Sequence, residues 1–422
     1  MKKVFSFFMV FMFLFNFKPI IANATQEIPE LECEGAALID ATTGTLLYGK
    51  NEHKQLAPAS TTKIMTALLI LENKKLDEKV TIGKNPTFAE GTRVGLKEGE
   101  IYTINDLLHG LLLESANDCA VALAESVSGS EKSFAELMNK RAKELGALDT
   151  NFVNASGLYE EGHVTTAYDL SLIMKTVVKN DTFVKISRKP LYQFPPSNID
   201  NSIKWVNNKN ELILNTPHFY KYAVSGKTGY TTLSKHTYTS AAEKNGQLLV
   251  LSILRSDSKK DYFPEAKKLF DYGFDNFDLI KLYSKGNEIA SCEAAKTKVP
   301  LICTKDIYYV TKKSDFKPNE TLEEKIKDLK ACVSLEQKDL SKASFKKGDN
   351  ILSANINVNN KQISTIPLSS GVDVTYTEPS KLSTPQGKLL LGLGIAMISL
   401  SAFATLYKIK KLKAKKKLEE DK

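Results

Sequence analysis

An uncharged run near the C-terminus sets the first limit on where this chain resides. Residues 389–407 (LLLGLGIAMISLSAFATLY) contain no charged side chain. At about 1.5 Å per residue, a helix of this length nearly matches a hydrocarbon core of about 30 Å. Ser399, Ser401 and Thr405 are only mildly polar and form no charged face, which favours a membrane-spanning helix over an amphipathic helix in the interface. We therefore expect a transmembrane helix at residues 389–407.

A basic tail follows this run. Residues 408–422 hold eight lysines and three acidic residues, and lysine-rich flanks remain on the cytoplasmic side of a membrane. The tail is therefore expected in the cytoplasm, with the preceding chain outside. Residues 378–388 contain two prolines and little apolar surface, which predicts a linker.

The N-terminus has the pattern of a secretory signal peptide. Two lysines are followed by an apolar stretch at residues 4–15 and by Ala-Asn-Ala at 22–24, a small-residue cleavage site. We expect a signal peptide at residues 1–24 and a mature chain that begins at Thr25. The alternative is an uncleaved anchor helix, but the apolar core is short for that purpose.

The net charge of +9 comes mostly from the two ends. The signal region contributes three positive charges and the tail a net five, so the exported part is nearly neutral. This distribution does not indicate nucleic-acid binding.

The five cysteines are an odd number for an exported chain. None forms a Cys-x-x-Cys pair, so a metal site is not expected. We expect no cofactor. The spacing leaves open a disulfide among Cys292, Cys303 and Cys332.

Strand signals flank a helical zone in the first part of the exported chain. Residues 36–50 read as a hairpin, and residues 238–242 and 247–254 flank Asn245-Gly246, a two-residue turn signal. Helical signals fall at residues 64–71, 104–113, 121–127, 134–145, 168–178 and 264–272. Strands at both ends imply a mixed α/β (α+β) domain, with one antiparallel sheet built from distant segments and a helical subdomain. We place this domain at residues 25–276.

The character of the chain then changes to short β-like runs. Residues 301–303, 307–310 and 351–358 read as strands, and the charged segment 320–340 has the composition of a short helix. We expect a second, small all-β domain at residues 279–377.

A Ser-x-x-Lys motif at Ser60 carries the first chemical signal. The motif occurs four times in the chain, but only Ser60-Thr61-Thr62-Lys63 leads into an apolar helix. Ser60 and Lys63 are three residues apart and share one helical face, so the Lys63 amine can reach the Ser60 hydroxyl. The helix N-terminus also offers free backbone N–H groups near the place where an oxyanion would form. A serine hydroxyl needs such a base to become a nucleophile.

Two further motifs follow in order. Ser115-Ala116-Asn117 lies in a break between two apolar helices, where Ser115 and Asn117 either point into a cleft or only cap the next helix. Lys227-Thr228-Gly229, the chain's single Lys-Thr-Gly, lies on a predicted strand. Lys227 supplies a second cation that can lower the pKa of Lys63, and Gly229 lets a substrate backbone approach the strand edge.

Together, the three motifs are the signature set of penicillin-binding proteins and class A β-lactamases. The chain resembles the D-alanyl-D-alanine carboxypeptidases, the low-molecular-mass penicillin-binding proteins, whose fold is that of the serine β-lactamases. The resemblance also covers Leu56-Ala57-Pro58-Ala59, Asn154-Ala155-Ser156-Gly157-Leu158 and His163. It is specific over residues 35–275 and looser over 279–377.

The resemblance implies a catalytic role for three residues. Ser60 is expected to attack the carbonyl between two terminal D-alanines, and Lys63 to act as general base. Ser115 is expected to pass a proton to the leaving amine, with Lys227 nearby. Water then hydrolyses the acyl-enzyme, and β-lactam antibiotics acylate the same serine.

The resemblance also implies the substrate-binding residues. Asn117 is expected to position the peptide amide, and Lys227 and Thr228 to receive the terminal carboxylate. Gly229 keeps the strand edge open, and the backbone N–H of Tyr230 completes an oxyanion hole with that of Ser60. The expected partners are peptidoglycan stem peptides, β-lactams and the cytoplasmic membrane.

The chain departs from the family pattern beyond Lys-Thr-Gly-Tyr-Thr. Leu233-Ser234-Lys235-His236 replaces a pair of small residues, so the rim of the substrate groove is expected to differ. His163 and His236 are not assigned as bases, because an isolated histidine near a sheet is more often structural.

Four other classes of protein fit the sequence less well. A class A β-lactamase lacks the appended β domain and the C-terminal helix, and its deacylating glutamate cannot be identified here. A non-catalytic wall-binding protein would not need the intact motifs. His-Glu-x-x-His and Gly-x-Ser-x-Gly are absent, which disfavours a zinc hydrolase and an esterase.

Overall fold

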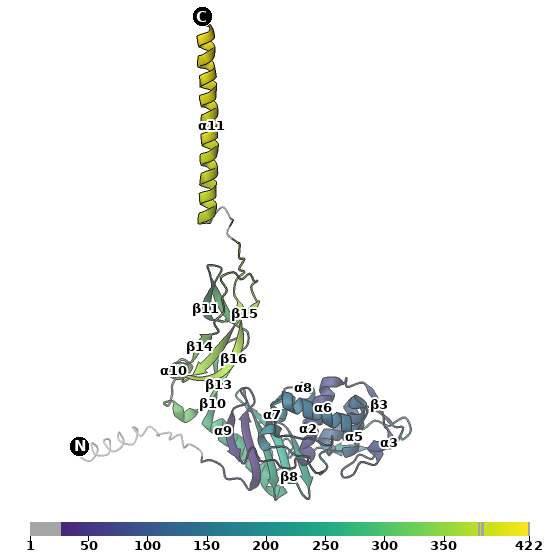
Figure 1. Ribbon diagram of the computed structural model, residues 1–422. Helices are drawn as coiled ribbons and strands as arrows, with labels where there is room; N and C mark the ends of the chain where they lie inside the picture. The colour runs from purple at the N-terminus through teal and green to yellow at the C-terminus, as the bar shows by residue number, and fades with distance from the viewer. Residues whose placement is uncertain (1–26, 379, 381–383, 421–422) are drawn as a thin grey trace, which may run out of the picture. The chain divides into compact units, whose positions relative to one another are not determined.

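The protein is described by a computed structural model that covers residues 27–378, 380 and 384–420. The predicted signal peptide lies outside these residues. The chain divides into two compact units (Figure 1). The first contains the chain up to Lys281 together with Tyr308–Ile326, and the second contains Leu282–Ile307 and the chain from Lys327 onward.

A five-stranded antiparallel sheet forms the centre of the first unit. Its order is β2-β1-β9-β8-β7, so the strands that follow the helical zone pair with the strands that precede it. The bounds are β1 Cys33–Asp40, β2 Leu46–Lys50, β7 Ala223–Thr231, β8 Lys235–Lys244 and β9 Gln247–Ser256.

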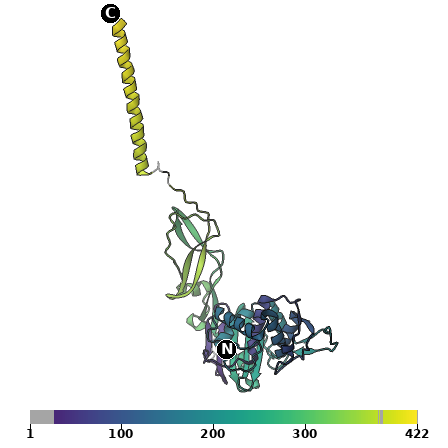
Figure 2. The same ribbon diagram turned by 45° about the vertical axis from the view of Figure 1, so that its right-hand side comes forward.

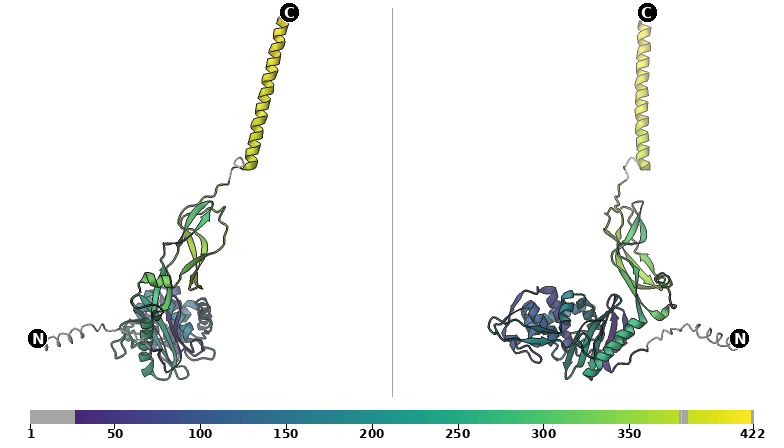
Figure 3. Two further views of the ribbon diagram at one scale, coloured as in Figure 1. Left: turned by 90° about the vertical axis from the view of Figure 1, so that its left-hand side faces the viewer. Right: turned by 180° about the vertical axis from the view of Figure 1, so that it is seen from behind.

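Alternating side chains on the strands bury both faces of this sheet. On β1, Ala37 and Ile39 belong to the core beneath the helical layer, whereas Ala36 and Leu38 belong to the core under α9 (Lys259–Asn276) on the other face. This is the period of two expected of a strand. Figure 3 shows α9 lying across the sheet.

The helical layer covers one face of the sheet. It consists of α2 Lys63–Asn73, α3 Lys84–Thr87, α4 Ile104–His109, α5 Asn117–Ser128, α6 Glu131–Glu144, α7 Ala167–Val177 and α8 Asp181–Ser187. Apolar side chains such as Leu68, Leu123 and Phe134 are fully or almost fully buried between these helices. The burial of each such side chain stabilises the fold by roughly 1.5–3 kcal/mol.

Short elements missed by the sequence pattern complete this unit. Two hairpins have strands of three residues each: β3 Lys79–Thr81 with β4 Ile101–Thr103, and β5 Leu191–Gln193 with β6 Trp205–Asn207. The helix expected at 104–113 also changes form, because α4 continues as a π-helical turn, η2, at Gly110–Glu114.

The second unit is built on a five-stranded sheet of order β11-β12-β16-β15-β14 (Figure 2). Its bounds are β11 Glu288–Ala294, β12 Thr297–Cys303, β14 Cys332–Leu335, β15 Asn350–Val358 and β16 Lys361–Ser370. A separate two-stranded sheet, whose residues belong mostly to the first unit, joins β10 Phe277–Tyr283 to β13 Ile307–Lys312. The charged segment 320–340 holds the short helix α10, Leu322–Asp328, before β14.

The C-terminal helix α11 spans Pro385–Glu420. Thr384 caps it by accepting a hydrogen bond from the backbone N–H of Gly387 at 3.0 Å, and proline is favoured at a first helical position. The helix therefore includes the last residues of the expected linker. Its stretch Pro385–Lys417 is long and apolar enough to cross a membrane, with a mean hydropathy of 2.2 and none of the apolar window buried.

All five cysteines are free thiols, so the structure contains no disulfide among Cys292, Cys303 and Cys332.

Candidate active site

Ser60 lies in a tight turn that leads into α2. The turn is a 3₁₀ helix, Ala59–Thr62, and Ala59 adopts a left-handed backbone with φ of +50°. The carbonyl of Pro58 accepts hydrogen bonds from Thr61 Oγ1 at 2.6 Å and from Thr237 Oγ1 on β8 at 2.8 Å. The sheet thus anchors the turn and leaves Ser60 partly exposed.

Lys63, the first residue of α2, is fully buried behind Ser60. Its Nζ lies 3.1 Å from Ser60 Oγ, 2.6 Å from Asn117 Oδ1 and 2.6 Å from the carbonyl oxygen of Ser156. Burial lowers the pKa of Lys63 well below its usual value, and the positive charge of Lys227 lowers it further. An uncharged amine donates two hydrogen bonds, here to the two carbonyl oxygens, and its lone pair is then free to accept the Ser60 proton.

The loop at residues 154–157 supplies one of these carbonyl acceptors. Asn154 Oδ1 accepts the backbone N–H groups of Ser156 at 3.2 Å and Gly157 at 2.8 Å. Thr66 on α2 donates its hydroxyl to the Ala155 carbonyl at 2.7 Å. The loop therefore holds the Ser156 carbonyl against Lys63, a contact that sequence analysis missed because it is made by the backbone.

Ser115 occupies the break between η2 and α5. It has a left-handed backbone, with φ of +69°, and its hydroxyl oxygen accepts a hydrogen bond from Lys227 Nζ at 3.0 Å. Lys227 also donates to the carbonyl of Thr228 at 2.6 Å. Burial lowers the pKa of Lys227 to about 7, an effect that Glu114 opposes.

Asn117 is largely buried and engaged at both ends of its amide. Its Oδ1 accepts from Lys63, and its Nδ2 donates to the Glu90 carbonyl at 2.6 Å. Its backbone N–H donates to the Thr92 carbonyl at 2.7 Å. Asn117 therefore ties the loop at residues 90–92 to Lys63, and its expected contact with substrate stays a prediction.

Strand β7 carries the remaining predicted residues along the edge of the sheet. Lys227 pairs with Thr239, and Gly229 with Thr237. A Cβ atom added at Gly229 would lie 2.7 Å from the backbone nitrogen of Ser60, so glycine permits the close approach of β7 to the nucleophile. Thr228 is partly exposed, and Tyr230 is 57% exposed with its ring 4.6 Å from that of His236.

The predicted residues thus form two adjoining groups. Ser60, Lys63 and Asn117 are joined by hydrogen bonds, as are Ser115, Lys227 and Thr228. The positive charge of Lys227 acts on Lys63 between the groups. Among the described residues, no group of three or more His, Cys, Asp and Glu side chains is placed to hold a metal ion.

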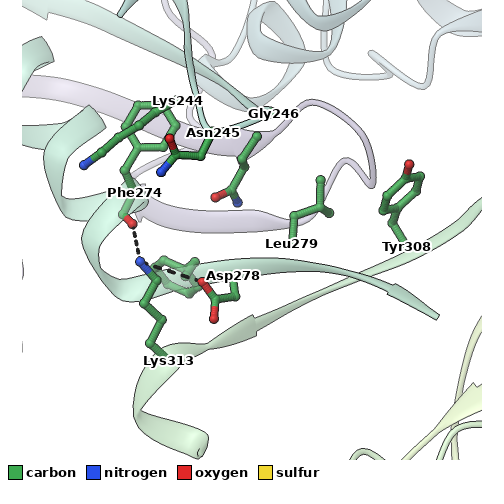
Figure 4. Close-up of a pocket in the computed structure, with 10 residues that line it drawn as sticks. Lys244, Asn245, Gly246, Phe274, Asp278, Leu279, Tyr308 and Lys313 are labelled. Carbon is green, nitrogen blue, oxygen red and sulfur yellow. Dashed lines mark hydrogen bonds and ion pairs between the residues drawn. The ribbon is translucent and has the colours of Figure 1, made fainter. Parts of the chain in front are cut away.

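A separate pocket of about 460 Å³ lies elsewhere in the first unit, at the β8–β9 turn (Figure 4). Lys313 Nζ donates there to the Phe274 carbonyl at 2.7 Å and lies 3.7 Å from Asp278. Lys244 lines another wall. None of the predicted catalytic or substrate-binding residues lines this pocket.

The sheet with its helical layer, and a serine backed by a buried lysine, define the class of serine-type hydrolases that use a Ser-x-x-Lys motif. Residues 22–258 match the family model described as D-alanyl-D-alanine carboxypeptidase. The chain therefore belongs to the D-alanyl-D-alanine carboxypeptidase family. Residues 277–376 match the model for the C-terminal domain of penicillin-binding protein 5.

Individual relatives agree with this assignment. The D-alanyl-D-alanine carboxypeptidase DacF of Bacillus subtilis is 32% identical over 365 residues, which cover 83% of this chain and 92% of the relative. DacB2 of Mycobacterium tuberculosis is 35% identical over 58% of this chain and 84% of its own length. The crystal structures of penicillin-binding protein 5 from Haemophilus influenzae superpose with a TM-score of 0.68 at 25% identity, covering 82% of this chain and 99% of that one.

These matches confirm the predicted fold class. The first unit has the serine penicillin-binding fold, the second domain is all-β, and a C-terminal apolar helix follows. They also confirm that the chain is a serine peptidase of the carboxypeptidase type.

Proposed function

We propose that the enzyme removes the terminal D-alanine from peptidoglycan stem pentapeptides through an acyl-enzyme on Ser60. The observation that carries this proposal is the environment of Lys63. Its buried amine faces two carbonyl oxygens that can only accept hydrogen bonds, and its third neighbour is the Ser60 hydroxyl. Burial and the positive charge of Lys227 favour the neutral amine, and the two carbonyl oxygens orient its N–H groups so that its lone pair faces Ser60 Oγ, 3.1 Å away.

Acylation then proceeds as one proton transfer and one displacement. Lys63 Nζ takes the Ser60 proton while Oγ bonds to the carbonyl carbon between the two D-alanines. The negative oxygen is held by the backbone N–H groups of Ser60 and Tyr230. The C–N bond breaks, and Ser115, bonded to Lys227, passes a proton to the departing amine of D-alanine. Ser115 recovers a proton from the Lys63 ammonium, so Lys63 is neutral again before water enters.

Deacylation restores the enzyme. Water attacks the Ser60 ester, its proton passes to Lys63, and the ester bond breaks to release the shortened stem peptide. The serine oxygen recovers its proton from Lys63. β-Lactams enter the same cycle, because opening of their ring forms the same ester on Ser60, which water then hydrolyses slowly.

The edge of β7 is proposed to bind the substrate. The Lys227 ammonium and the Thr228 hydroxyl receive the terminal carboxylate, and Asn117 orients the peptide amide. The absence of a side chain at Gly229 lets β7 lie close to Ser60, and the substrate backbone is proposed to lie between Tyr230 and Ser60. No cofactor takes part.

The location follows from the two ends of the chain. We propose that a signal peptide exports the chain and that α11 anchors it in the cytoplasmic membrane. The catalytic unit then faces the cell wall, where trimming of stem peptides contributes to wall maturation. The lysines after residue 407 remain on the cytoplasmic side.

Labelling with a fluorescent penicillin tests the assignment. S60A is expected to abolish the covalent adduct, as seen by mass spectrometry with peptide mapping, while the far-UV circular dichroism spectrum is kept. K63R places at this position a guanidinium that stays protonated and cannot act as a base, so we expect acylation to fall by orders of magnitude while reversible binding persists.

Two results would count against the assignment. An adduct in S60A would place the nucleophile elsewhere, and near-normal acylation of K63R would make Lys63 structural. Rapid release of hydrolysed penicillin by the unmodified enzyme would instead indicate a β-lactamase.

A further inference from the structure

Helix α6 is hydrogen-bonded to the loop at residues 152–157 at two points. Asn139 exchanges two hydrogen bonds with the backbone of Phe152, at 2.8 and 2.7 Å. About two turns earlier, Glu131 at the start of the helix accepts the backbone N–H of Ala155 at 3.1 Å. Ala155 directly precedes Ser156, whose carbonyl receives Lys63 at 2.6 Å.

Glu131, which makes the second of these contacts, also has an electrostatic effect on the catalytic lysine. Burial and then Lys227 lower the pKa of Lys63, whereas Cys119 and Asp118 on α5 and Glu131 on α6 act in the opposite direction. Burial raises the pKa of Glu131 itself, the hydrogen bond from Ala155 opposes this rise, and the carboxylates of Glu160 and Glu125 add to it. Its position at a helix N-terminus favours the ionised form.

We propose that Glu131 is a positioning residue for Lys63. Its hydrogen bond to Ala155 fixes the Ser156 carbonyl against the lysine amine, and its negative charge favours the protonated amine. The charge thereby shifts upward the pH at which the Lys63 amine loses its proton. This inference rests on the proposed role of Lys63 as the base.

Three variants separate these two effects. E131Q keeps an oxygen that can accept the Ala155 N–H but removes the charge. E131A removes both. N139A is the matched control, because it loosens the same loop from the same helix and leaves the charge near Lys63 in place.

The readout is the rate of acylation by a chromogenic cephalosporin as a function of pH, scaled to the fraction of enzyme that labels covalently. We expect the acid limb of the E131Q profile to move to lower pH, while N139A keeps the limb of the unmodified enzyme. E131A should show the same displacement and a plateau about tenfold lower, because a misplaced catalytic group loses rate steeply.

The outcomes are distinct from those that test the base itself. If the acid limb of the E131Q profile coincides with the acid limbs of the unmodified enzyme and N139A, the electrostatic role of Glu131 is overturned. This comparison does not depend on whether E131A folds. Equal plateaus in E131A and E131Q overturn the positioning role. Near-normal acylation of K63R would instead refute the assignment of Lys63.

Discussion

Two buried histidines of the catalytic unit are held in their neutral form. His163 Nδ1 accepts the backbone N–H of Val153 at 3.1 Å, so its proton lies on Nε2, which is 2.9 Å from Thr62 Oγ1. His109 bonds to the Asn105 carbonyl through Nδ1, and its Nε2 is buried without a hydrogen-bond partner. Burial lowers the pKa of each to about 4.

This arrangement predicts a loss of stability in mild acid. The pKa of His163 is lower in the folded chain than the ordinary value of about 6.5, so its contribution is complete above pH 6.5 and is lost as the pH falls toward 4. Linkage gives a loss of about 2 kcal/mol per histidine between pH 7 and pH 5. H163Q can keep both hydrogen bonds and should lose about 2 kcal/mol less than the unmodified protein over this interval.

Urea unfolding of both proteins at pH 7 and pH 5 measures the difference. Equal losses of unfolding free energy in the two proteins would show that His163 is not held neutral by its site.

Single residues also show what the sequence could and could not predict. Ser60, Lys63 and Ser115 belong to short motifs that can be recognised by their spacing. The predicted helix after Ser60 and the predicted break at Ser115 were enough to place them. The carbonyl of Ser156 and the carboxylate of Glu131 act through backbone contacts between segments far apart in the chain. No residue pattern records such contacts, so these two could be found only from the fold.

At the scale of elements, the nucleophile turn depends on a glycine in the neighbouring loop. Gly157 has φ of +79°, and a Cβ atom there would lie 1.9 Å from the Ala59 carbonyl oxygen. Gly162, in the same connection, has φ of +82°, and a Cβ atom added there would lie 3.8 Å from Asn151 Nδ2. The two glycines therefore share a backbone conformation and differ in the space around them.

G157A is expected to destabilise the unit by about 2–5 kcal/mol, the sum of left-handed strain and overpacking. It should also slow acylation at Ser60, because the turn that carries the serine must move. G162A introduces only the left-handed strain, so it should destabilise the unit by about 1–2 kcal/mol. Its Ser60 should be acylated at the normal rate. Urea unfolding and penicillin labelling of both variants test this, and equal effects would disprove the role of the Ala59 contact.

The length of each element explains how well it was predicted. Long elements show several repeats of a helical or strand pattern, and those predicted from it are present in the structure: α5, α6, α7 and the β8–β9 hairpin. The β3–β4 and β5–β6 hairpins have only three residues per strand, too few to establish a period. The π-helical turn after α4 is also invisible in the pattern, because Gly110–Glu114 is as apolar as a regular helix.

At the scale of the molecule, the apolar surface of α11 is exposed and fills no core. Large apolar side chains are exposed along the helix, including Leu391, Ile398 and Phe403 at 51–72%. Deletion of residues 385–422 therefore removes no buried core. We expect the truncated protein to move from the membrane to the soluble fraction while it keeps its penicillin labelling and its activity on a D-Ala-D-Ala peptide.

Fractionation of cells that express the full and the truncated chains provides the measurement, with labelled protein quantified in each fraction. A truncated protein that is insoluble or unlabelled would show that α11 is part of the folded enzyme.

The strand order of the catalytic sheet also fixes when the enzyme can first react. Cys33 of β1 pairs with Ser256 of β9. Strand β1 is synthesised first, but it cannot complete this pairing until β9, more than 200 residues later, has been synthesised. Strand β7, which carries Lys227, is joined to β1 in this sheet through β8 and β9. A nascent chain that ends before residue 247 therefore contains all three motifs and yet has no assembled nucleophile, so antibiotic labelling reports that synthesis has passed β9.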